Sequence, residues 1–448
     1  MTKPNSLGQW SSRWMFIMAA TGSAVGLGNV WKFPYMTGQY GGSSFVIVYL
    51  LCVLLVGLPI LIAEIMIGRR GQSSPAEATA KLAVESGKSR NWWWLGFLGM
   101  LTAFLFLSVY SIVAGWTASY LVRSLQGSFT GLTPTQIGLM FDDFLADPWQ
   151  LFMWHTFFML ITVVIVARGL KEGLERAIRW MVPGLFLIII ILVGYALSTP
   201  GFSEGIKFMF RVDWAAIDTQ SFLSALGHSF FTLSVATASM MIYGAYLERK
   251  ASIAKIAITI ATLDTLVALM AGMAIFPLVF TYGLPHDQGP SLVFKTLPIA
   301  FGEMPGGSII GGMFFLLLLL AALGSSISLV EPIVAWLIER WNIKRTVAAW
   351  CSSTLIWVLG FASLLSFNHW QDIKLFGLWT YYSFVDALVS LVMLPFGGLL
   401  LAIYAGWIMK EKFTKEELNM PNGLYTTWRF IVRYFSPIAV LVIAWISF

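Results

Sequence analysis

The segment ATGSAVGLGNVWKFPY, residues 20–35, is the most informative part of this sequence. It lies in an apolar run, yet it contains Gly22, Gly26 and Gly28, and Asn29 follows directly. Glycine disfavours a helix interior by about 1 kcal/mol relative to alanine. At membrane depth, non-helical backbone is tolerated only where protein or a water-filled cavity covers it. The glycines therefore indicate either a broken helix at a binding site or a surface for close helix packing, which the Gly22-x-x-x-Gly26 spacing also fits.

The composition predicts a protein that crosses a membrane many times. The 448 residues are 58% hydrophobic and only 11% charged, and the mean hydropathy is +0.78. A soluble domain carries about 25% charged residues. The two cysteines, Cys52 and Cys351, lie in apolar segments, so we interpret them as packing residues rather than as a disulfide or a metal site.

A membrane-spanning helix needs about 20 mostly apolar residues. The sequence contains eleven such segments. They cover residues 13–37, 43–68, 92–124, 151–168, 175–197, 221–246, 253–281, 308–338, 346–366, 378–409 and 426–447.

Most of the 28 lysines and arginines lie in alternate loops. Because positively charged loops stay in the cytoplasm, the N-terminus is predicted inside and, with eleven spans, the C-terminus outside. The outer loop GLTPTQIGLMFDDFLADP is expected to form short surface helices, and DQGPSLVFKTLPIAFGEMPGG a re-entrant hairpin or lid. Short outer loops without glycosylation sequons favour a bacterial inner membrane.

Several motifs together resemble the neurotransmitter:sodium symporter family. GSAVGLGNVWKFPY is similar to the first-span signature of that family, and FFTLS is similar to its sixth-span signature. Further matches follow in order along nearly the whole chain. They are LPILIAEIMIGRRG, Tyr110 with Trp116, Gly173 followed after nine residues by Pro183, and LGSSISLVEP.

The resemblance implies an all-α polytopic membrane protein with the LeuT-like fold. Its eleven transmembrane helices would include two inverted five-helix repeats, with breaks in helices 1 and 6. The repeats would cover residues 1–200 and 201–410, and residues 411–448 would hold a cytoplasmic loop and the eleventh helix.

The family resemblance also implies a secondary active transporter rather than an enzyme. We expect sodium-coupled uptake of neutral, mostly hydrophobic L-amino acids by alternating access. Family members that carry amines usually have an aspartate at the position of Gly26, so its absence here favours amino acids. The expected donors to the substrate carboxylate are the N–H groups of Gly26, Leu27 and Gly28 and the hydroxyl of Tyr110. The expected acceptors from its ammonium group are the carbonyl oxygens of Ala24, Phe231 and Thr232.

The side-chain pocket is expected to be neutral, because a buried charge without a partner is costly. Relative to the small aliphatic amino-acid transporter that typifies the fold, Phe106 replaces a small aliphatic residue and Thr237 replaces an aromatic one. These two changes move volume from one wall to the other. The expected lining is Phe106, Phe231, Ser234, Thr237, Ser325 and Leu329.

Two sodium ions are expected, since sodium takes oxygen ligands. By resemblance, the first would use the Ala24 carbonyl, Asn29, Thr232, and Asp264 where the family has an asparagine. Chloride-dependent relatives have a serine that helps to hold chloride at the position of Ala268, and chloride-independent relatives have an acid there, so this sequence meets neither pattern. Asp264 lies one turn earlier and could supply the same negative charge from within the protein. We therefore predict no chloride requirement.

The second sodium site is expected to use three carbonyls and one hydroxyl. Its ligands would be Gly22, Val25, Ala321 and Ser325. Gly324 stands where the family often has a hydroxyl, so Ser326 or water would have to replace that ligand.

Charged and aromatic residues are expected to form gates. Lys32 and Asp386 would face each other across the outer vestibule above Tyr110 and Phe231. The inner gate would include Trp10, Tyr246 and Glu339, with Lys3 as a substitute for the basic residue that Leu7 replaces. Gly173 and Pro183 would let the fifth span unwind, and Glu64 would bond backbone freed by the break in the first span.

The sequence is also compatible with two other functions. An intramembrane aspartate is a functional candidate, so Asp264 could carry a proton, and a proton-coupled amino acid transporter is the first alternative. A sodium or amino-acid sensor is the second. We expect the protein to lie in a lipid bilayer and to bind no nucleic acid. The sequence does not indicate an oligomeric state.

Overall fold

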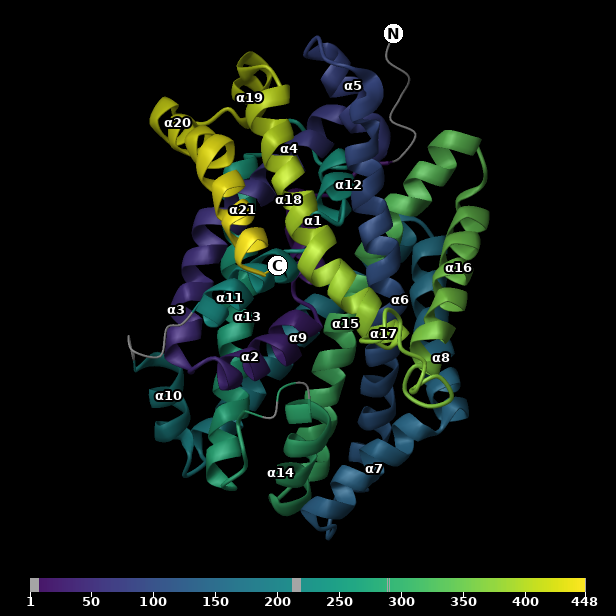
Figure 1. Ribbon diagram of the computed structural model, residues 1–448, viewed down its shortest axis with the longest axis vertical. Helices are drawn as coiled ribbons and strands as arrows, with labels where there is room; N and C mark the ends of the chain where they lie inside the picture. The colour runs from purple at the N-terminus through teal and green to yellow at the C-terminus, as the bar shows by residue number, and fades with distance from the viewer. Residues whose placement is uncertain (1–7, 212–218, 288, 290, 448) are drawn as a thin grey trace.

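The chain forms a single bundle of helices in the computed structural model, which describes residues 8–211, 219–287, 289 and 291–447, with side chains described to residue 442 (Figure 1). Eight helical segments are long and apolar enough to cross a membrane. They are Ser43–Gly71, Arg90–Leu125, Pro148–Ala167, Leu170–Leu197, Ile253–Thr281, Gly307–Trp341, Arg345–Leu365 and Tyr381–Ile408.

Each of these segments is built from one or two labelled helices, some joined by π turns. In chain order, they are α3 (Ser43–Cys52) with α4 (Leu58–Gly71), α6 (Trp93–Leu125), α8 (Pro148–Ala167), α9 (Arg176–Leu197), α13 (Ile253–Thr281), α15 (Gly307–Trp341), α16 (Arg345–Leu365), and α17 (Tyr381–Ala387) with α18 (Leu394–Ile403).

The other three predicted spans are helical but shorter or interrupted. Residues 13–37 form α1 (Arg13–Ala24), a π turn (Gly28–Lys32) and α2 (Phe33–Gln39). Residues 221–246 form α11 (Thr219–Thr232) and α12 (Ser239–Ala245), with non-helical backbone between them. Residues 426–447 form α20 (Asn422–Phe430), a π turn (Ile431–Phe435) and α21 (Ser436–Ser447). All eleven predicted segments are therefore helical, and the first and sixth are broken.

The two ends of the bundle carry different short helices. The end that holds α5 (Pro75–Glu85) and α19 (Glu411–Leu418) is called the α5 face, at the top of Figure 1. The opposite end, called the α7 face, carries α7 (Pro134–Ala146), α10 (Phe202–Phe210) and α14 (Leu297–Glu303).

The sides of the bundle expose large apolar residues that a soluble protein would bury. Along α9, Trp180 is 78% exposed, Leu187 60% and Ile190 56%. A contiguous apolar surface of this kind marks contact with another protein or with a membrane. Here it covers helices of membrane-spanning length, which indicates that this surface faces lipid.

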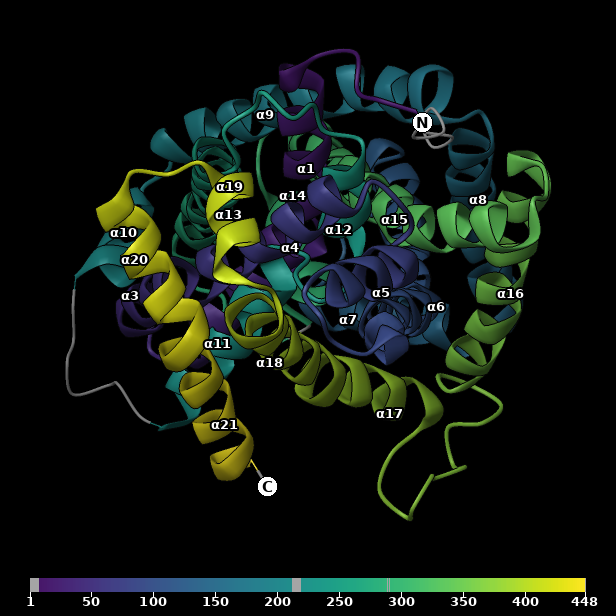
Figure 2. The ribbon, with the colours of Figure 1, turned by 90° about the horizontal axis from the view of Figure 1, so that it is seen from above.

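Figure 2 shows α1, α4, α12 and α15 near the centre of the bundle, while α8 with α16 and α20 with α21 lie on opposite sides. The central helices approach closely where glycines face backbone. A Cβ on Gly68 of α4 would lie 1.8 Å from the Met241 carbonyl oxygen of α12, and one on Gly244 would lie 2.6 Å from the Ile65 oxygen. These contacts bring the two halves of the chain together.

Ion pairs fix the short helices at both faces. On the α5 face, Arg69 bonds the Glu417 side chain at 2.6 Å, which ties α19 to the end of α4. On the α7 face, Lys295 pairs with Asp142 at 2.7 Å. This pair ties α7 to the loop after α13, which forms a π turn at Leu292–Thr296 followed by α14.

Gly68→Ala is expected to destabilise the protein, because its new Cβ cannot occupy the position beside the Met241 oxygen without moving α4 from α12. Overpacking of this kind typically costs about 1–3 kcal/mol. Thermal unfolding of purified protein would show a lower Tm. Gly194→Ala is the matched control, since nothing lies within 4 Å of its Cβ position in α9. Equal Tm values for the two variants would contradict the close approach of α4 and α12.

Candidate functional site

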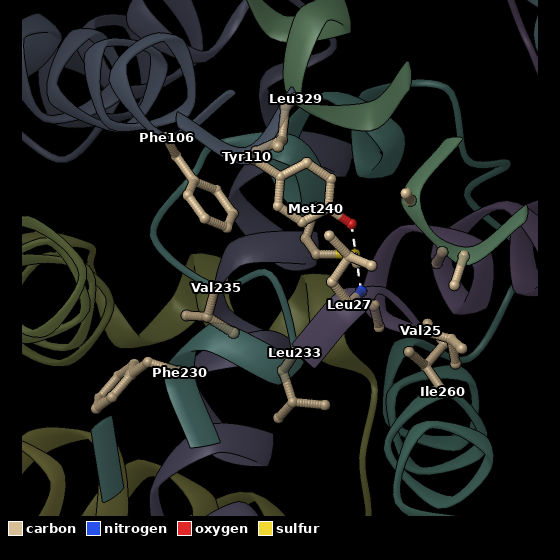
Figure 3. Close-up of a cluster of buried hydrophobic side chains, with 14 of the residues drawn as sticks. Val25, Leu27, Phe106, Tyr110, Phe230, Leu233, Val235, Met240, Ile260 and Leu329 are labelled. Carbon is tan, nitrogen blue, oxygen red and sulfur yellow. Dashed lines mark hydrogen bonds between the residues drawn. The ribbon is translucent and has the colours of Figure 1, made fainter. Parts of the chain in front are cut away.

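The first break separates α1 from the π turn that follows it. Val25 takes an extended conformation with ψ 98°. The freed N–H of Gly26 donates to the Asn29 side-chain oxygen at 3.0 Å, and that of Leu27 donates to the Tyr110 hydroxyl at 3.3 Å (Figure 3). A Cβ on Gly26 would lie 2.5 Å from the Ser325 hydroxyl. The break and the close packing predicted from these glycines thus occur together.

The second break, between α11 and α12, is conformationally strained. Ser234, Ala236 and Ala238 have φ of 51°, 66° and 61°, the left-handed region that costs about 1–3 kcal/mol for a residue other than glycine. The Glu64 carboxylate accepts the Ala236 N–H at 3.0 Å. Our sequence prediction for Glu64 was wrong in one respect: it satisfies the second break rather than the first. The reason is that α4 packs against α12.

Aromatic side chains line a small space beside the two breaks. The ring of Phe106 lies 5.3 Å from that of Tyr110 and 5.0 Å from that of Phe231. Figure 3 shows Phe106, Tyr110 and Leu329 on one side of the breaks, with the Tyr110 hydroxyl directed at Leu27. Of the predicted pocket residues, the structure gathers Gly26, Phe106, Tyr110, Phe231, Ser325 and Leu329 around this space.

Two predicted pocket hydroxyls are already bonded within the protein. Ser234 donates to the Ser23 carbonyl oxygen at 2.9 Å. Thr237 donates to the Ser234 carbonyl oxygen at 2.7 Å and to the Ser239 hydroxyl at 3.0 Å. These side chains therefore stabilise the second break, and the space they leave is mostly apolar.

A buried polar cluster lies where the π turn after α1 meets α11 and α13. The Asn29 amide nitrogen donates to the Asp264 carboxylate at 2.7 Å and to the Thr232 hydroxyl at 3.0 Å. The Thr232 hydroxyl donates to the second Asp264 oxygen at 2.9 Å. All three side chains are at most 1% exposed. Among the described residues, no ion pair includes Asp264. A buried carboxylate with only neutral donors favours a cation or a proton beside it.

The predicted second sodium site offers fewer hydroxyls than expected. A Cβ on Gly324 would lie 2.2 Å from the Gly22 carbonyl oxygen, so a longer side chain does not fit there. The Ser325 hydroxyl donates to the Ser23 oxygen at 3.0 Å. The Ser326 hydroxyl donates to the Leu323 oxygen at 3.0 Å and faces Thr162 of α8 at 2.9 Å. Ser326 is therefore turned away from α1.

From the aromatic space, a hollow of about 940 Å³ extends toward the α7 face. Lys32 and Asp386 both line it, and the Lys32 ammonium group lies 4.3 Å from the centre of the Phe231 ring. The ion pairs of the described residues do not join Lys32 to Asp386. Besides Phe106, Tyr110 and Phe231, the aromatic residues of its wall are Trp31, Tyr35, Trp116, Phe141, Phe294, Phe367 and Tyr382.

At the α5 face, buried and hydrogen-bonded side chains close the end of the helix bundle, so this face is called sealed. Trp10 is 3% exposed, and its indole donates to the Tyr243 carbonyl oxygen at 3.1 Å. The Tyr246 hydroxyl donates to the Glu331 carboxylate at 2.6 Å. Arg345 completes this network by pairing with Glu331, to which its Nη1 donates at 3.0 Å.

This network differs from the predicted inner gate. Tyr246 is joined to Glu331 rather than to Glu339, which instead accepts the Ser74 N–H at 2.9 Å. Sequence reasoning missed Glu331, although an acid in the apolar run SLVEPIVAW was a visible signal. It also missed Arg345, which looks like an ordinary charged loop residue. Lys3 and Leu7 lie outside the described residues.

The predicted hinge residues lie close to the N-terminal segment. Gly173 is part of a π turn at Leu170–Glu175, and Pro183 lies inside α9. The Glu175 carboxylate accepts the Ser11 N–H at 2.7 Å, one residue after Trp10. The hinge region is helical here and bonded to the segment that seals the α5 face.

Comparison with known proteins assigns this geometry to a family. The sequence model of the sodium:neurotransmitter symporter family matches residues 7–135 and 135–448. An uncharacterized sodium-dependent transporter, YhdH of Bacillus subtilis, is 37% identical over 97% of this chain and 96% of its own length. An uncharacterized sodium-dependent transporter of Haemophilus influenzae is 31% identical over 99% of both chains.

A solved structure gives the same answer for the fold. The crystal structure of MhsT in complex with L-phenylalanine matches 98% of this chain and 100% of its own, with 38% identity and a TM-score of 0.91. The fold is therefore LeuT-like, and the motifs of the sequence and the two helix breaks are those of a transporter rather than of an enzyme. The chain belongs to the sodium:neurotransmitter symporter family, and it is a multi-pass membrane protein and a sodium-coupled symporter.

Proposed function

We propose that this protein takes up neutral, mostly hydrophobic L-amino acids with sodium by alternating access. The observation that carries this proposal is the pairing of two sites across one helix break. The aromatic space of Phe106, Tyr110 and Phe231 lies on one side of residues 24–29, and the Asp264 cluster lies on the other. The similar structure of MhsT, which is a complex with L-phenylalanine, supports this substrate class.

The first break supplies the contacts for an amino-acid carboxylate. The Tyr110 hydroxyl accepts from the Leu27 N–H at 3.3 Å, and its own proton can be donated to a carboxylate. The N–H groups at the break and the start of the following helical segment also favour an anion. The carbonyl oxygens of Ala24, Phe231 and Thr232 are the proposed acceptors from the ammonium group. A neutral, aromatic wall leaves no partner for a charged substrate side chain, which would lose its hydration.

We assign the first sodium ion to the Asp264 cluster. Asp264 and Thr232 supply carboxylate and hydroxyl oxygens, which are the ligands that hard cations prefer. The Asn29 amide presents its nitrogen to the cluster and its oxygen to the Gly26 N–H, so it would have to turn over to offer the ion its oxygen. Because Asp264 already provides a buried negative charge, a chloride ion is not needed to balance sodium and substrate. We therefore propose transport without a chloride requirement.

The second sodium ion is assigned to the carbonyl oxygens of Gly22, Val25 and Ala321. The hydroxyl of Ser325 would have to leave the Ser23 oxygen in order to join them. Gly324 contributes no hydroxyl. We therefore propose two sodium sites of unequal strength, with the second weaker than the first.

The shape of the molecule corresponds to one state of the transport cycle. Arg69 and Arg70, at the end of α4, lie on the α5 face, so we place this face in the cytoplasm of a bacterial cell, together with the N-terminus. Eleven spans then put the C-terminus outside. The hollow toward the α7 face and the sealed α5 face support our proposal of an outward-facing state, in which Lys32 and Asp386 have yet to close over the substrate.

Alternating access requires parts of the molecule that move relative to one another. We propose inverted repeats at residues 1–200 and 201–410, followed by a loop and the eleventh span at residues 411–448. Opening to the cytoplasm would release Trp10 from α12, break the Tyr246–Glu331–Arg345 network and unwind the chain between Gly173 and Pro183.

The direct test is uptake of labelled neutral amino acids by purified protein in proteoliposomes. Uptake of hydrophobic amino acids is expected with an imposed sodium gradient, and not with an equal potassium gradient. Replacement of chloride by gluconate is expected to leave the rate unchanged. Uptake that follows a proton gradient and ignores sodium would replace this proposal with proton coupling at Asp264. Saturable binding without any uptake would favour a sensor.

Asp264→Asn is expected to raise the sodium concentration for half-maximal uptake at least tenfold, which corresponds to about 1.4 kcal/mol. The variant keeps the shape of the cluster and removes its negative charge. Chloride is expected to restore part of the uptake by supplying that charge from solution. The measurement is initial uptake against sodium, with and without chloride. An unchanged sodium dependence would place the coupling ion elsewhere.

Glu331→Gln is expected to loosen the sealed α5 face, because the Arg345 guanidinium would lose its charged partner. Amide hydrogen exchange in residues 10–24 should become several-fold faster, as openings that release Trp10 become more frequent. Tyr246→Phe is the milder control, since it removes only the hydrogen bond to Glu331. Identical exchange in all three proteins would show that this network does not hold the face closed.

A further inference from the structure

A second hollow, of about 1110 Å³, lies on the α5 face and has no part in the site described above. It lies between the start of α5, the start of α6 and the end of α15. Figure 2 shows α5 directly over α6. The residues that line it are Ser74, Ala76, Glu77, Arg90, Trp93, Trp336, Glu339 and Arg340.

Two groups in this hollow lack partners. Ser74 precedes α5, where a serine usually accepts a backbone N–H of the first turn, yet its side chain makes no such bond. Its hydroxyl is fully buried and unbonded, at a position that lines the hollow. Arg340 is exposed and has no ion-pair partner in the described part of the chain. Both groups can donate to a carboxylate, and the start of α5 favours a negative charge.

An acid and two indoles complete the hollow. Glu339 uses one carboxylate oxygen to accept the Ser74 N–H at 2.9 Å, which leaves the other free for an ammonium group. Arg90 and Glu77 pair with each other at 2.8 Å and neutralise one another. Trp93 and Trp336 each pack against Phe97 and form an apolar wall. The centre of the Phe97 ring lies 5.5 Å from that of Trp93 and 5.8 Å from that of Trp336.

Only a thin apolar layer separates this hollow from the second helix break. Ala76, Met100 and Ala238 form a small buried cluster, against which Phe97 and Trp336 pack. Ala76 and Trp336 belong to the hollow, whereas Ala238 is the last residue of the break. An amino acid that leaves the central site past this cluster would enter the hollow directly.

We propose that this hollow is a second binding site for a zwitterionic amino acid with a hydrophobic side chain, on the cytoplasmic side of the central site. Its carboxylate is held by Arg340 and the Ser74 hydroxyl, its ammonium group by Glu339, and its side chain by Trp93 and Trp336. The proposal rests on the proposed function for its ligand class. Binding here needs no sodium, because no part of the Asp264 cluster contributes to the site.

Saturation-transfer NMR with L-phenylalanine as the probe would test this site in sodium-free potassium buffer. The wild-type protein is expected to show saturable transfer. Arg340→Gln and Ser74→Ala are each expected to weaken that binding at least fivefold. Lys344→Gln, a neighbouring exposed cation outside the hollow, is the matched control and should retain it. N-acetyl-L-phenylalanine, which lacks the ammonium group, should bind more weakly than phenylalanine. Absence of transfer in the wild type, or equal transfer in Arg340→Gln, would overturn the proposal.

Two further measurements separate this site from the central one and from lipid. Sodium-dependent binding of labelled phenylalanine should be unchanged in Arg340→Gln and lost in Tyr110→Phe, which should keep the sodium-independent signal. If sodium-dependent binding is absent from the wild type while the potassium signal persists, the proposed function fails and this site stands. Loss of the potassium signal in nanodiscs of phosphatidylethanolamine and phosphatidylglycerol would assign the hollow to a lipid headgroup and overturn the proposal.

Discussion

Backbone groups freed inside a membrane must find partners within the protein, because the bilayer core offers none. This constraint organises the centre of the molecule. Asn29 accepts the Gly26 N–H and Tyr110 accepts that of Leu27, while Glu64 accepts that of Ala236. Each partner comes from a side chain that is also placed to contact substrate, ion or neighbouring helix. The groups that make the breaks tolerable therefore also shape the site.

The buried carboxylate of Asp264 sets the electrostatics of this centre. Its donors, Asn29 and Thr232, are neutral, so the cluster favours either a cation or a proton beside the carboxylate. In the proposed function, a sodium ion beside Asp264 would remove the cost of its buried charge and would favour a substrate carboxylate across the break. Ion and amino acid would then stabilise each other through residues 24–29, and such a coupling free energy is reciprocal by thermodynamic necessity.

Glycines in an apolar span indicated the first break, whereas the fold, the second break and the grouping of Asn29, Thr232 and Asp264 were predicted from the resemblance to the symporter family. The sequence did not allow partners to be chosen among residues far apart in the chain. Glu64 could have met either break, and only the packing of α4 on α12 selects the second. Likewise, the direction of the Ser325 hydroxyl and the pairing of Glu331 with Arg345 depend on how α15 meets α1 and α16.

The two faces of the molecule differ in how much must be broken to open them. On the α7 face, Lys32 and Asp386 face a hollow and have no mutual ion pair to lose, and closing that face adds contacts. On the α5 face, opening breaks the Trp10 and Tyr246 hydrogen bonds and disrupts the ion pair of Arg345 with the buried Glu331. Breaking such a pair is costly while either charge stays buried without its partner. With the α7 face outside, as proposed above, the transporter is expected to rest facing outward, and binding of sodium and substrate would supply the free energy that opens the α5 face.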